Sequence, residues 1–220
     1  PAGTRALDRA RAQSVALATT ALGQGPGFVT TGSERLRSKS LDRNSYNSGD
    51  WFNQIVWDCA AGNGFGRGLP PAADNETKWP FAQPLLADPA LVPGCAAIDL
   101  ADARYQELLR IRRSTPVFGL PTAAEVQKRL SFPLSGTGET PGVITMTLDG
   151  RGIDRTAKSV TVVFNGTSAA TTQTVASFED RSVALHPVQR ASADPLVRTA
   201  SFAAGTFTVP ARTVAVFVES

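Results

Sequence analysis

The sequence has 220 residues, of which 42% are hydrophobic and 19% charged, so it can bury a core and is not compositionally disordered. The net charge of +3 is small and most basic residues are scattered, which argues against nucleic acid as a partner. No apolar run reaches the roughly 20 residues that span a bilayer, so a membrane is not an expected partner either.

The first regular element predicted is a helix over residues 4–22, where apolar residues between Leu7 and Ala21 recur at helical spacing. Two glycines and a proline end it. Residues 28–31 then form a short β-prone run between glycines, which predicts a buried strand. A helix, a tight turn and a strand make the repeating step of parallel sheets and α/β barrels.

Residues 32–53 show no helical or strand period and are rich in amides, charged groups and aromatic rings. They follow the carboxyl end of the predicted strand, which is where α/β folds place their active sites. A long ordered loop of this composition favours a functional role, and its side chains suit the hydroxyls and ring faces of a sugar. By composition alone, a solvated loop held by its own salt bridges is an equal alternative.

Residues 54–98 contain little regular pattern, and the glycine-rich segment 62–68 lacks a Walker lysine, so we interpret it as a loop. Cys59 and Cys95 either form a disulfide or remain two small unpaired hydrophobic residues, and the sequence leaves both possibilities open. The glycosylation sequons at Asn75 and Asn165 are short enough to be coincidental.

The chain has one histidine, His186, and no Cys or His cluster, which makes a transition-metal site an unexpected feature. His186 has no nucleophile or carboxylate partner in the pattern, so we predict a structural histidine. A second helix is predicted over residues 99–113, and the arginines near its end, Arg110, Arg112 and Arg113, are expected to be solvated.

After about residue 122 the pattern changes to apolar residues at every second position. Strands are predicted at residues 143–148, 160–164 and 214–218, with shorter ones at 182–185 and 206–209. Short alternating strands without intervening helices indicate an antiparallel sandwich or barrel. The fold class is therefore α/β plus all-β, with a boundary between residues 1–121 and 122–220.

Several segments resemble one family, in order along the whole chain. They are Leu22-Gly-Gln-Gly25, Gly32-Ser-Glu34, Arg37-Ser-Lys-Ser-Leu-Asp-Arg-Asn-Ser-Tyr-Asn-Ser-Gly-Asp-Trp-Phe-Asn53, Gly68-Leu-Pro-Pro71, Leu108-Leu-Arg-Ile-Arg112, Pro141-Gly-Val-Ile-Thr-Met146, Leu185-His-Pro-Val-Gln189 and Val209-Pro-Ala-Arg-Thr-Val-Ala-Val-Phe217. They look like the carboxyl-terminal part of pullulanase-type α-1,6-glucosidases, the starch-debranching enzymes of the α-amylase superfamily.

The resemblance implies that residues 28–31 are the eighth strand of a (β/α)8 barrel and that the helices at 4–22 and 99–113 flank it. Residues 1–121 would be the carboxyl-terminal part of this catalytic barrel. Residues 122–220 would be the antiparallel β-sandwich that follows it. Members of the family are retaining hydrolases of α-1,6 branch linkages in pullulan, amylopectin and limit dextrins.

Retaining hydrolysis needs two carboxyl groups about 5 Å apart. In the family these groups precede the part matched here, so we assign no catalytic residue and expect this chain alone to be inactive. The expected partners are a branched α-glucan and the missing N-terminal barrel portion of the same protein. No cofactor is expected from the residues; the resemblance allows calcium, although no EF-hand-like acidic loop is present.

Asn44 stands where the family contacts a glucose unit of the substrate. Its neighbours Arg43, Tyr46 and Asp50 are predicted either to bind sugar or to brace the loop, and an Arg43–Asp50 pair would be such a brace. Trp51 and Phe52 are expected to anchor the loop, and Arg67 is a further residue for the cleft.

A non-catalytic starch-binding module is the alternative function. Such modules usually expose aromatic rings for stacking on sugars, and residues 122–220 contain no Trp or Tyr. This composition favours a domain that packs against the barrel. The compartment of the protein and its preferred glucan length stay open.

Overall fold

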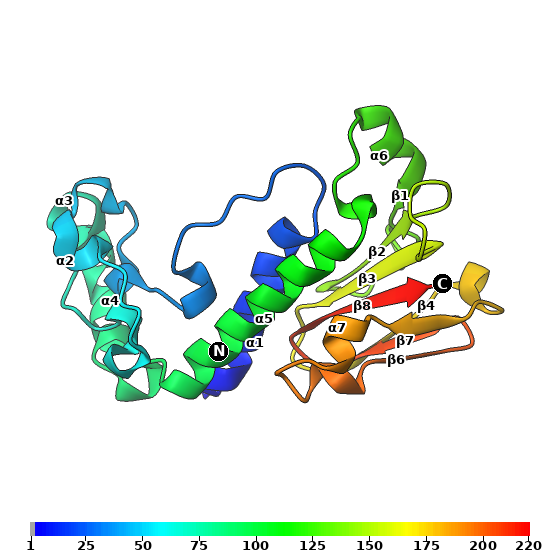
Figure 1. The fold of residues 1–220 in the computed structure, drawn as a ribbon. Helices are drawn as coiled ribbons and strands as arrows, with labels where there is room; N and C mark the ends of the chain where they lie inside the picture. The colour runs from blue at the N-terminus through cyan, green and yellow to red at the C-terminus, as the bar shows by residue number, and fades with distance from the viewer. Residues whose placement is uncertain (1–2) are drawn as a thin grey trace. The chain divides into compact units, whose positions relative to one another are not determined.

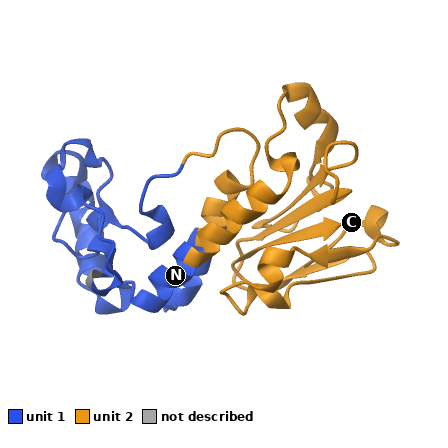
Figure 2. Ribbon diagram, viewed as in Figure 1, with its two compact units in different colours: residues 1–13, 29–102 blue, residues 14–28, 103–220 orange. Residues whose placement is uncertain are grey.

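The computed structural model describes residues 3–220, and the chain divides into two compact units (Figures 1 and 2). Unit 1 contains the described residues up to Gln13 together with Val29–Asp102, and unit 2 contains Ser14–Phe28 and Ala103–Ser220. The predicted boundary between residues 121 and 122 separates a barrel part from an all-β domain. The division into these two units does not test it, so it stays a prediction.

The helices are α1 (Ala6–Ala21), α2 (Gly49–Asn53), α3 (Ala72–Asn75), α4 (Trp79–Leu86), α5 (Cys95–Ser114), α6 (Ala123–Arg129) and α7 (Pro187–Arg190). The strands are β1 (Leu130–Ser131), β2 (Val143–Asp149), β3 (Ser159–Asn165), β4 (Thr171–Thr174), β5 (Val183–Leu185), β6 (Ser201–Ala203), β7 (Thr206–Val209) and β8 (Thr213–Glu219). The two predicted helices are confirmed as α1 and α5, and all five predicted strands are present.

The strands of unit 2 form two antiparallel sheets, which confirms the predicted sandwich. One sheet has the order β1-β2-β3-β8-β5 and the other the order β4-β7-β6. Strand β3 lies in the middle of the larger sheet, where Val162 is opposite Met146 of β2 and Val216 of β8. All seven residues of β3 are buried, because both faces of this sheet are covered.

Different elements cover the two faces. On one face, Met146, Val162 and Val216 pack with apolar residues of the helices, among them Ala18 and Leu108. Figure 1 shows α1 and α5 running beside each other on this side of the sheet.

The opposite face of the larger sheet packs against the smaller sheet. Val163, Ala215 and Phe217 share a core there with Phe207 of β7, whose ring centroid is 5.0 Å from that of Phe217. Alternating positions of one strand therefore contribute to two separate cores.

The strand predicted at residues 28–31 does not form. None of the strand pairings in the described part of the chain involves these residues, and the Phe28 side chain is 85% exposed. A parallel strand is held by hydrogen bonds to neighbouring strands. Because no described segment lies beside residues 28–31 as a strand, the β-propensity of the run is not sufficient.

Arg112 is half-buried and hydrogen-bonded, in contrast to the sequence prediction of a solvated side chain. Its guanidinium donates hydrogen bonds to the main-chain carbonyls of Ala21 (2.9 Å), Gly23 (2.7 Å) and Gly25 (2.6 Å). The last carbonyls of a helix have no partner within it, and a cation there also suits the helix dipole. Arg112 thus caps the carboxyl end of α1 from a neighbouring helix.

Both glycosylation sequons lie on buried asparagines. The Asn165 amide donates to the carbonyls of Ala169 (2.8 Å) and Pro210 (2.9 Å), and Asn75 is 98% buried within unit 1. Neither amide nitrogen is available for modification in the folded chain, and the interpretation of both sequons as coincidental stays a prediction.

Among the described residues no single helix is both long and apolar enough to cross a membrane. Ala72–Leu86 and Pro89–Ser114, which meet at an angle of 88°, satisfy the length and composition criteria only when they are taken together.

His186 has a structural role in unit 2, as the sequence predicted. Its Nδ1 accepts a hydrogen bond from the Val188 N–H (3.2 Å) at the start of α7, and its Nε2 lies 3.1 Å from the Ser114 hydroxyl. Burial lowers the pKa of His186 below its ordinary value, and the charge of Arg190 lowers it further.

A buried ion pair ties α5 to the loop that follows α7. Arg104 donates to the Glu107 carboxylate, to the Ser192 hydroxyl (3.1 Å) and to the Val214 carbonyl (3.2 Å). Glu107 also accepts from the Ser192 hydroxyl (2.8 Å) and from the Ala193 N–H (2.8 Å). Arg104 and Glu107 are each 98% buried, so each charge depends on the other.

Replacing Arg104 alone should therefore be costly. We expect Arg104→Met to lower the free energy of unfolding by about 3–5 kcal/mol, because it leaves the Glu107 carboxylate buried without a counter-ion. The double variant Arg104→Met/Glu107→Leu should recover much of that loss. Urea unfolding of both variants measures the difference, and a double variant no more stable than the single one would contradict the explanation.

The pKa of His186 gives the stability a pH dependence. Because the unfolded chain binds a proton more readily than the folded one, stability should fall as the pH drops below about 6.5. We expect a lower melting temperature at about pH 5.5 than at about pH 7.5, and a smaller difference in His186→Asn. Asparagine retains an acceptor for the Val188 N–H but does not titrate. An unchanged difference in the variant would assign the effect to other groups.

Candidate functional site

The loop 32–53 lies in unit 1 and consists of short turns. Before α2 these are the 3₁₀ turns η1 (Ser33–Arg35), η2 (Lys39–Leu41) and η3 (Ser45–Asn47). Leu36, Lys39, Ser40 and Leu41 have positive φ angles of 59°, 49°, 53° and 63°. Each such angle costs a non-glycine residue roughly 1 kcal/mol or more, so surrounding contacts must enforce this backbone.

Hydrogen bonds to main-chain carbonyls supply part of that enforcement. The Ser40 hydroxyl is fully buried and donates to the Gly68 carbonyl at 2.6 Å. Arg37 donates from its two terminal nitrogens to the carbonyls of Thr31 (2.9 Å) and Asn53. The two ends of the loop are thereby joined through one guanidinium.

Asp42 and Asn75 form the polar centre of the loop. The Asp42 carboxylate accepts from the Ser48 hydroxyl, from the Asn75 amide (2.9 Å) and from the Asn44 N–H (3.2 Å). The side-chain oxygen of Asn75, Oδ1, accepts in turn from the main-chain N–H of Arg43 at 3.0 Å. Desolvation alone would raise the pKa of Asp42, but these hydrogen bonds outweigh it and hold the pKa below its ordinary value.

Trp51 and Arg67 clamp α2 to the glycine-rich segment. The indole N–H donates to the Arg67 carbonyl (2.8 Å), and the Arg67 guanidinium donates back to the Trp51 carbonyl (2.6 Å). The guanidinium carbon also lies 5.2 Å from the centre of the indole ring. The prediction that Trp51 anchors the loop agrees with these contacts, and Arg67 is its partner.

The four predicted substrate residues are displayed on this framework. Asn44, Arg43, Tyr46 and Asp50 are all exposed, and the Tyr46 side chain is 88% exposed. The Asn44 amide donates one hydrogen bond to Asp74 at 3.2 Å. Among the described residues its side-chain oxygen has no partner, so it can accept from an external hydroxyl.

The expected brace between Arg43 and Asp50 is absent. Within residues 3–220 no ion pair includes either side chain, so this part of the prediction is wrong. Asp42 performs the bracing instead, because its carboxylate points into the loop and meets buried donors. The charges of Arg43 and Asp50 are consequently left to face solvent.

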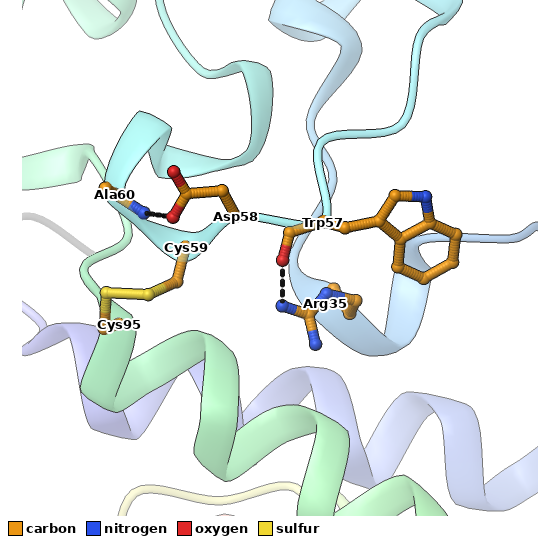
Figure 3. The surroundings of a disulfide bond; sticks show 6 residues. All are labelled: Arg35, Trp57, Asp58, Cys59, Ala60 and Cys95. Carbon is orange, nitrogen blue, oxygen red and sulfur yellow. Dashed lines mark hydrogen bonds between the residues drawn. A yellow bond between two sulfur atoms is a disulfide. The ribbon is translucent and has the colours of Figure 1, made fainter.

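A disulfide between Cys59 and Cys95 fixes the neighbouring segment (Figure 3). Their Cα atoms lie 4.8 Å apart, and the bridge joins the turn after Trp57 to the first residue of α5. The Arg35 guanidinium donates to the Trp57 carbonyl (2.8 Å) and pairs with Asp102 (2.9 Å). The indole of Trp57 is 64% exposed and lies 6.0 Å from the Arg35 guanidinium carbon.

The arrangement suits hydrogen bonding to a polar ligand. Amide, phenol, guanidinium and carboxylate groups face solvent from a backbone that is held from within. Among residues 3–220 no group of three or more His, Cys, Asp or Glu side chains is placed to hold a metal ion. Calcium, which the resemblance allows but which was not expected from the residues, stays untested.

A protein-family model described as "Alpha-1,6-glucosidases, pullulanase-type, C-terminal" matches residues 60–220. The chain belongs to this family. It is 43% identical to pullulanase 1, chloroplastic, of Arabidopsis thaliana over 97% of its length, and it covers 23% of that protein.

Two solved structures agree with this membership. PulA from Klebsiella oxytoca matches over 99% of the chain with a TM-score of 0.88 and 32% identity. A maltotriose complex of PulA from Klebsiella pneumoniae matches over 96% with a TM-score of 0.84 and 33% identity. The chain spans 21% and 23% of these two proteins. The mixed helical and antiparallel-sheet fold is thus the fold of this region of the family.

Two residues of the site were missed by sequence reasoning. Asn75 braces the loop from 33 positions beyond Asp42, and no local pattern indicates that contact. Trp57 lies in a segment without helical or strand periodicity, so no pattern drew attention to it. The only signal in the sequence is a tryptophan within a loop-like segment, a residue type that often contributes to binding.

The disulfide should contribute strongly to the stability of unit 1. Closing a loop between positions 36 residues apart limits the unfolded chain. We expect Cys59→Ser/Cys95→Ser to cost about 3–4 kcal/mol. Hydrogen exchange of the amides between the two positions measures this loss.

A reductant provides the matched control. It should accelerate exchange in the wild-type protein to the rate of the serine variant and should leave the variant unchanged. A wild-type protein indifferent to the reductant would show that the bridge adds nothing.

Proposed function

We propose that this chain is the carboxyl-terminal part of a retaining hydrolase of α-1,6 linkages in branched α-glucans, and that the loop 32–53 forms one wall of its glucan site. The Asn44 side chain accepts a hydrogen bond from a hydroxyl of a glucose unit and donates one to it, and the Tyr46 ring stacks on the sugar. Arg43 and Asp50 contribute charged hydrogen-bonding groups at the same surface.

The observation that carries the proposal is the contrast within the loop. The Ser40 hydroxyl and the Asp42 carboxylate are engaged by the Gly68 carbonyl and the Asn75 amide, which lie outside the loop. The side chains of Asn44, Arg43, Tyr46 and Asp50, by contrast, are exposed to solvent. A backbone that keeps left-handed conformations under internal hydrogen bonds is preorganised, and preorganisation reduces the entropy lost when a ligand binds. The maltotriose complex of the similar Klebsiella pneumoniae protein supports an oligosaccharide as that ligand.

In this proposal residues 28–31 pair as the eighth strand of a (β/α)8 barrel whose other strands belong to the rest of the protein. Residues 1–121 complete that barrel, and 122–220 form the domain that packs against it. The two carboxyl groups that a retaining mechanism requires belong to the other part. The 220-residue chain is accordingly inactive by itself.

Four phenylalanines of residues 122–220 favour an enzyme domain over a starch-binding module. Phe164, Phe178, Phe207 and Phe217 are buried in the two cores, although Phe132 is exposed. They are therefore not available as stacking platforms for sugar rings.

Asn44→Ala in the complete protein tests the role of the loop. We expect kcat/KM for a branched dextrin to fall roughly tenfold, as the loss of one good hydrogen bond to substrate would produce. The melting temperature should stay within experimental error, since the only hydrogen bond lost within the protein is the exposed one to Asp74.

Asn47→Ala is the matched control. Asn47 is exposed in the same loop and makes no side-chain hydrogen bond with the described residues, so its loss should leave the kinetics unchanged. Identical kinetics of Asn44→Ala and wild type would remove Asn44 from the site. An equal decrease in both variants would indicate a general disturbance of the loop.

A further inference from the structure

A cavity of about 530 Å³ lies in unit 2, far along the chain from the loop 32–53. Its walls come from α6, from the ends of β2 and β8, from the start of β3 and from the 3₁₀ turn η8 (Ala176–Phe178). In Figure 1 the end of β8, marked C, and the neighbouring short turn lie at the same end of the sheets. The volume is in the range of sites for small ligands.

The lining of this cavity is strongly cationic. Five basic side chains contribute to it, and only two carboxylates do, those of Asp149 and Glu219. The five are Lys128, Arg129, Arg151, Lys158 and Arg181.

Both carboxylates are already engaged. Asp149 receives two hydrogen bonds from the Arg151 guanidinium (2.9 and 2.8 Å). Glu219 accepts from the Ser159 hydroxyl (2.8 Å) and pairs with Arg181 (3.2 Å). An incoming cation would find no free carboxylate here, whereas an anion would find unused donors.

The arginines are fixed and still have donors to offer. Arg129 donates to Glu125 (2.5 Å) and to the carbonyls of Asp149 and Arg151 (3.2 and 2.8 Å), and its side chain is 8% exposed. Arg181 stacks on the Phe178 ring, with its guanidinium carbon 4.2 Å from the ring centre. In both guanidiniums one terminal nitrogen, Nη2, has no partner among the described residues, and each could serve a ligand.

Of the five basic side chains, the two lysines have the fewest hydrogen-bond and ion-pair partners. Lys158 uses one of its three donors, for the Ser220 carbonyl (2.7 Å), and Lys128 makes only a 4.0 Å ion pair with Glu125. Both side chains are exposed at the cavity, so their ammonium groups can reorient toward a ligand without breaking a buried contact.

We propose that this cavity binds a phosphate group, either as free phosphate or as the monoester of a sugar. A tetrahedral dianion can accept from several cations on different walls at once, which matches unused donors on α6, on the turn after β2, just before β3 and beside η8. A carboxylate ligand would need only one guanidinium to pair both of its oxygens, as Arg151 pairs those of Asp149, so it would not require donors on several walls. A nucleic acid would need an extended cationic track rather than one local hollow.

Isothermal titration calorimetry on the complete protein tests the proposal with sodium phosphate, glucose 6-phosphate, glucose and acetate at constant ionic strength. We expect saturable binding of both phosphate compounds that added glucose does not displace, and no binding of acetate. Tighter binding of glucose 6-phosphate supports a sugar monoester as the ligand, and equal binding supports free phosphate. No saturable binding of either phosphate compound, or equal binding of acetate, overturns the proposal.

Lys128→Gln/Lys158→Gln should weaken phosphate binding at least about tenfold, since one charge-assisted hydrogen bond carries roughly that factor. Lys78→Gln, which removes an exposed lysine of unit 1, is the matched control and should bind as the wild type does. Unchanged melting temperatures verify folding. Equal phosphate affinity in the double variant and the control would overturn the assignment. These measurements do not depend on hydrolysis, so they stand or fail separately from the Asn44 test.

Discussion

Between residues 32 and 48 the backbone forms only isolated 3₁₀ turns, so no continuous ladder of main-chain hydrogen bonds fixes it. Side chains must replace that ladder, and the Asp42–Asn75 contact is the centre of the replacement. Asp42 satisfies donors from both sides of the turn, and Asn75 returns a hydrogen bond to the Arg43 N–H. The exposure of Asn44 and Tyr46 depends on this inward use of polar groups, because a loop held from within can display its remaining side chains.

In unit 2, by contrast, regular secondary structure fixes the backbone. Strand β3 is buried on both faces and fully paired on both edges, so its position follows from backbone hydrogen bonds and apolar packing together. Buried polar side chains inside this unit form hydrogen bonds across elements, as Arg104 and Glu107 do. The basic side chains that line the cavity lie at the surface near the end of the sheets, and several of their N–H donors have no partner among the described residues.

Sequence reasoning succeeded where one strong period runs through a segment. The spacing of apolar residues predicted α1, α5 and the alternating strands, because burial of a face is a local and repetitive signal. It missed β4, whose sequence Thr-Thr-Gln-Thr has no apolar alternation and whose position depends on pairing with β7. Residues 28–31 are not a strand in this structure, because a parallel strand needs neighbouring strands that β-propensity does not provide.

At the site, residue types were predictable and contacts were not. The exposed amides and rings of the loop are visible in the sequence, and so is Trp51 as an anchor. The partners Asn75 and Arg67, the capping role of Arg112 and the pairing of Cys59 with Cys95 all join positions far apart in the chain. Such contacts depend on three-dimensional proximity, for which spacing along one sequence gives no measure.

The burial of Asn75 and Asn165 has a practical consequence for heterologous production. Each asparagine is an acceptor sequon while the chain is unfolded, and each amide nitrogen donates hydrogen bonds inside the folded protein. In a eukaryotic secretory host, attachment of a glycan to the nascent chain would compete directly with folding, since a bulky, hydrated sugar cannot enter either position. A host that lacks N-glycosylation avoids that competition.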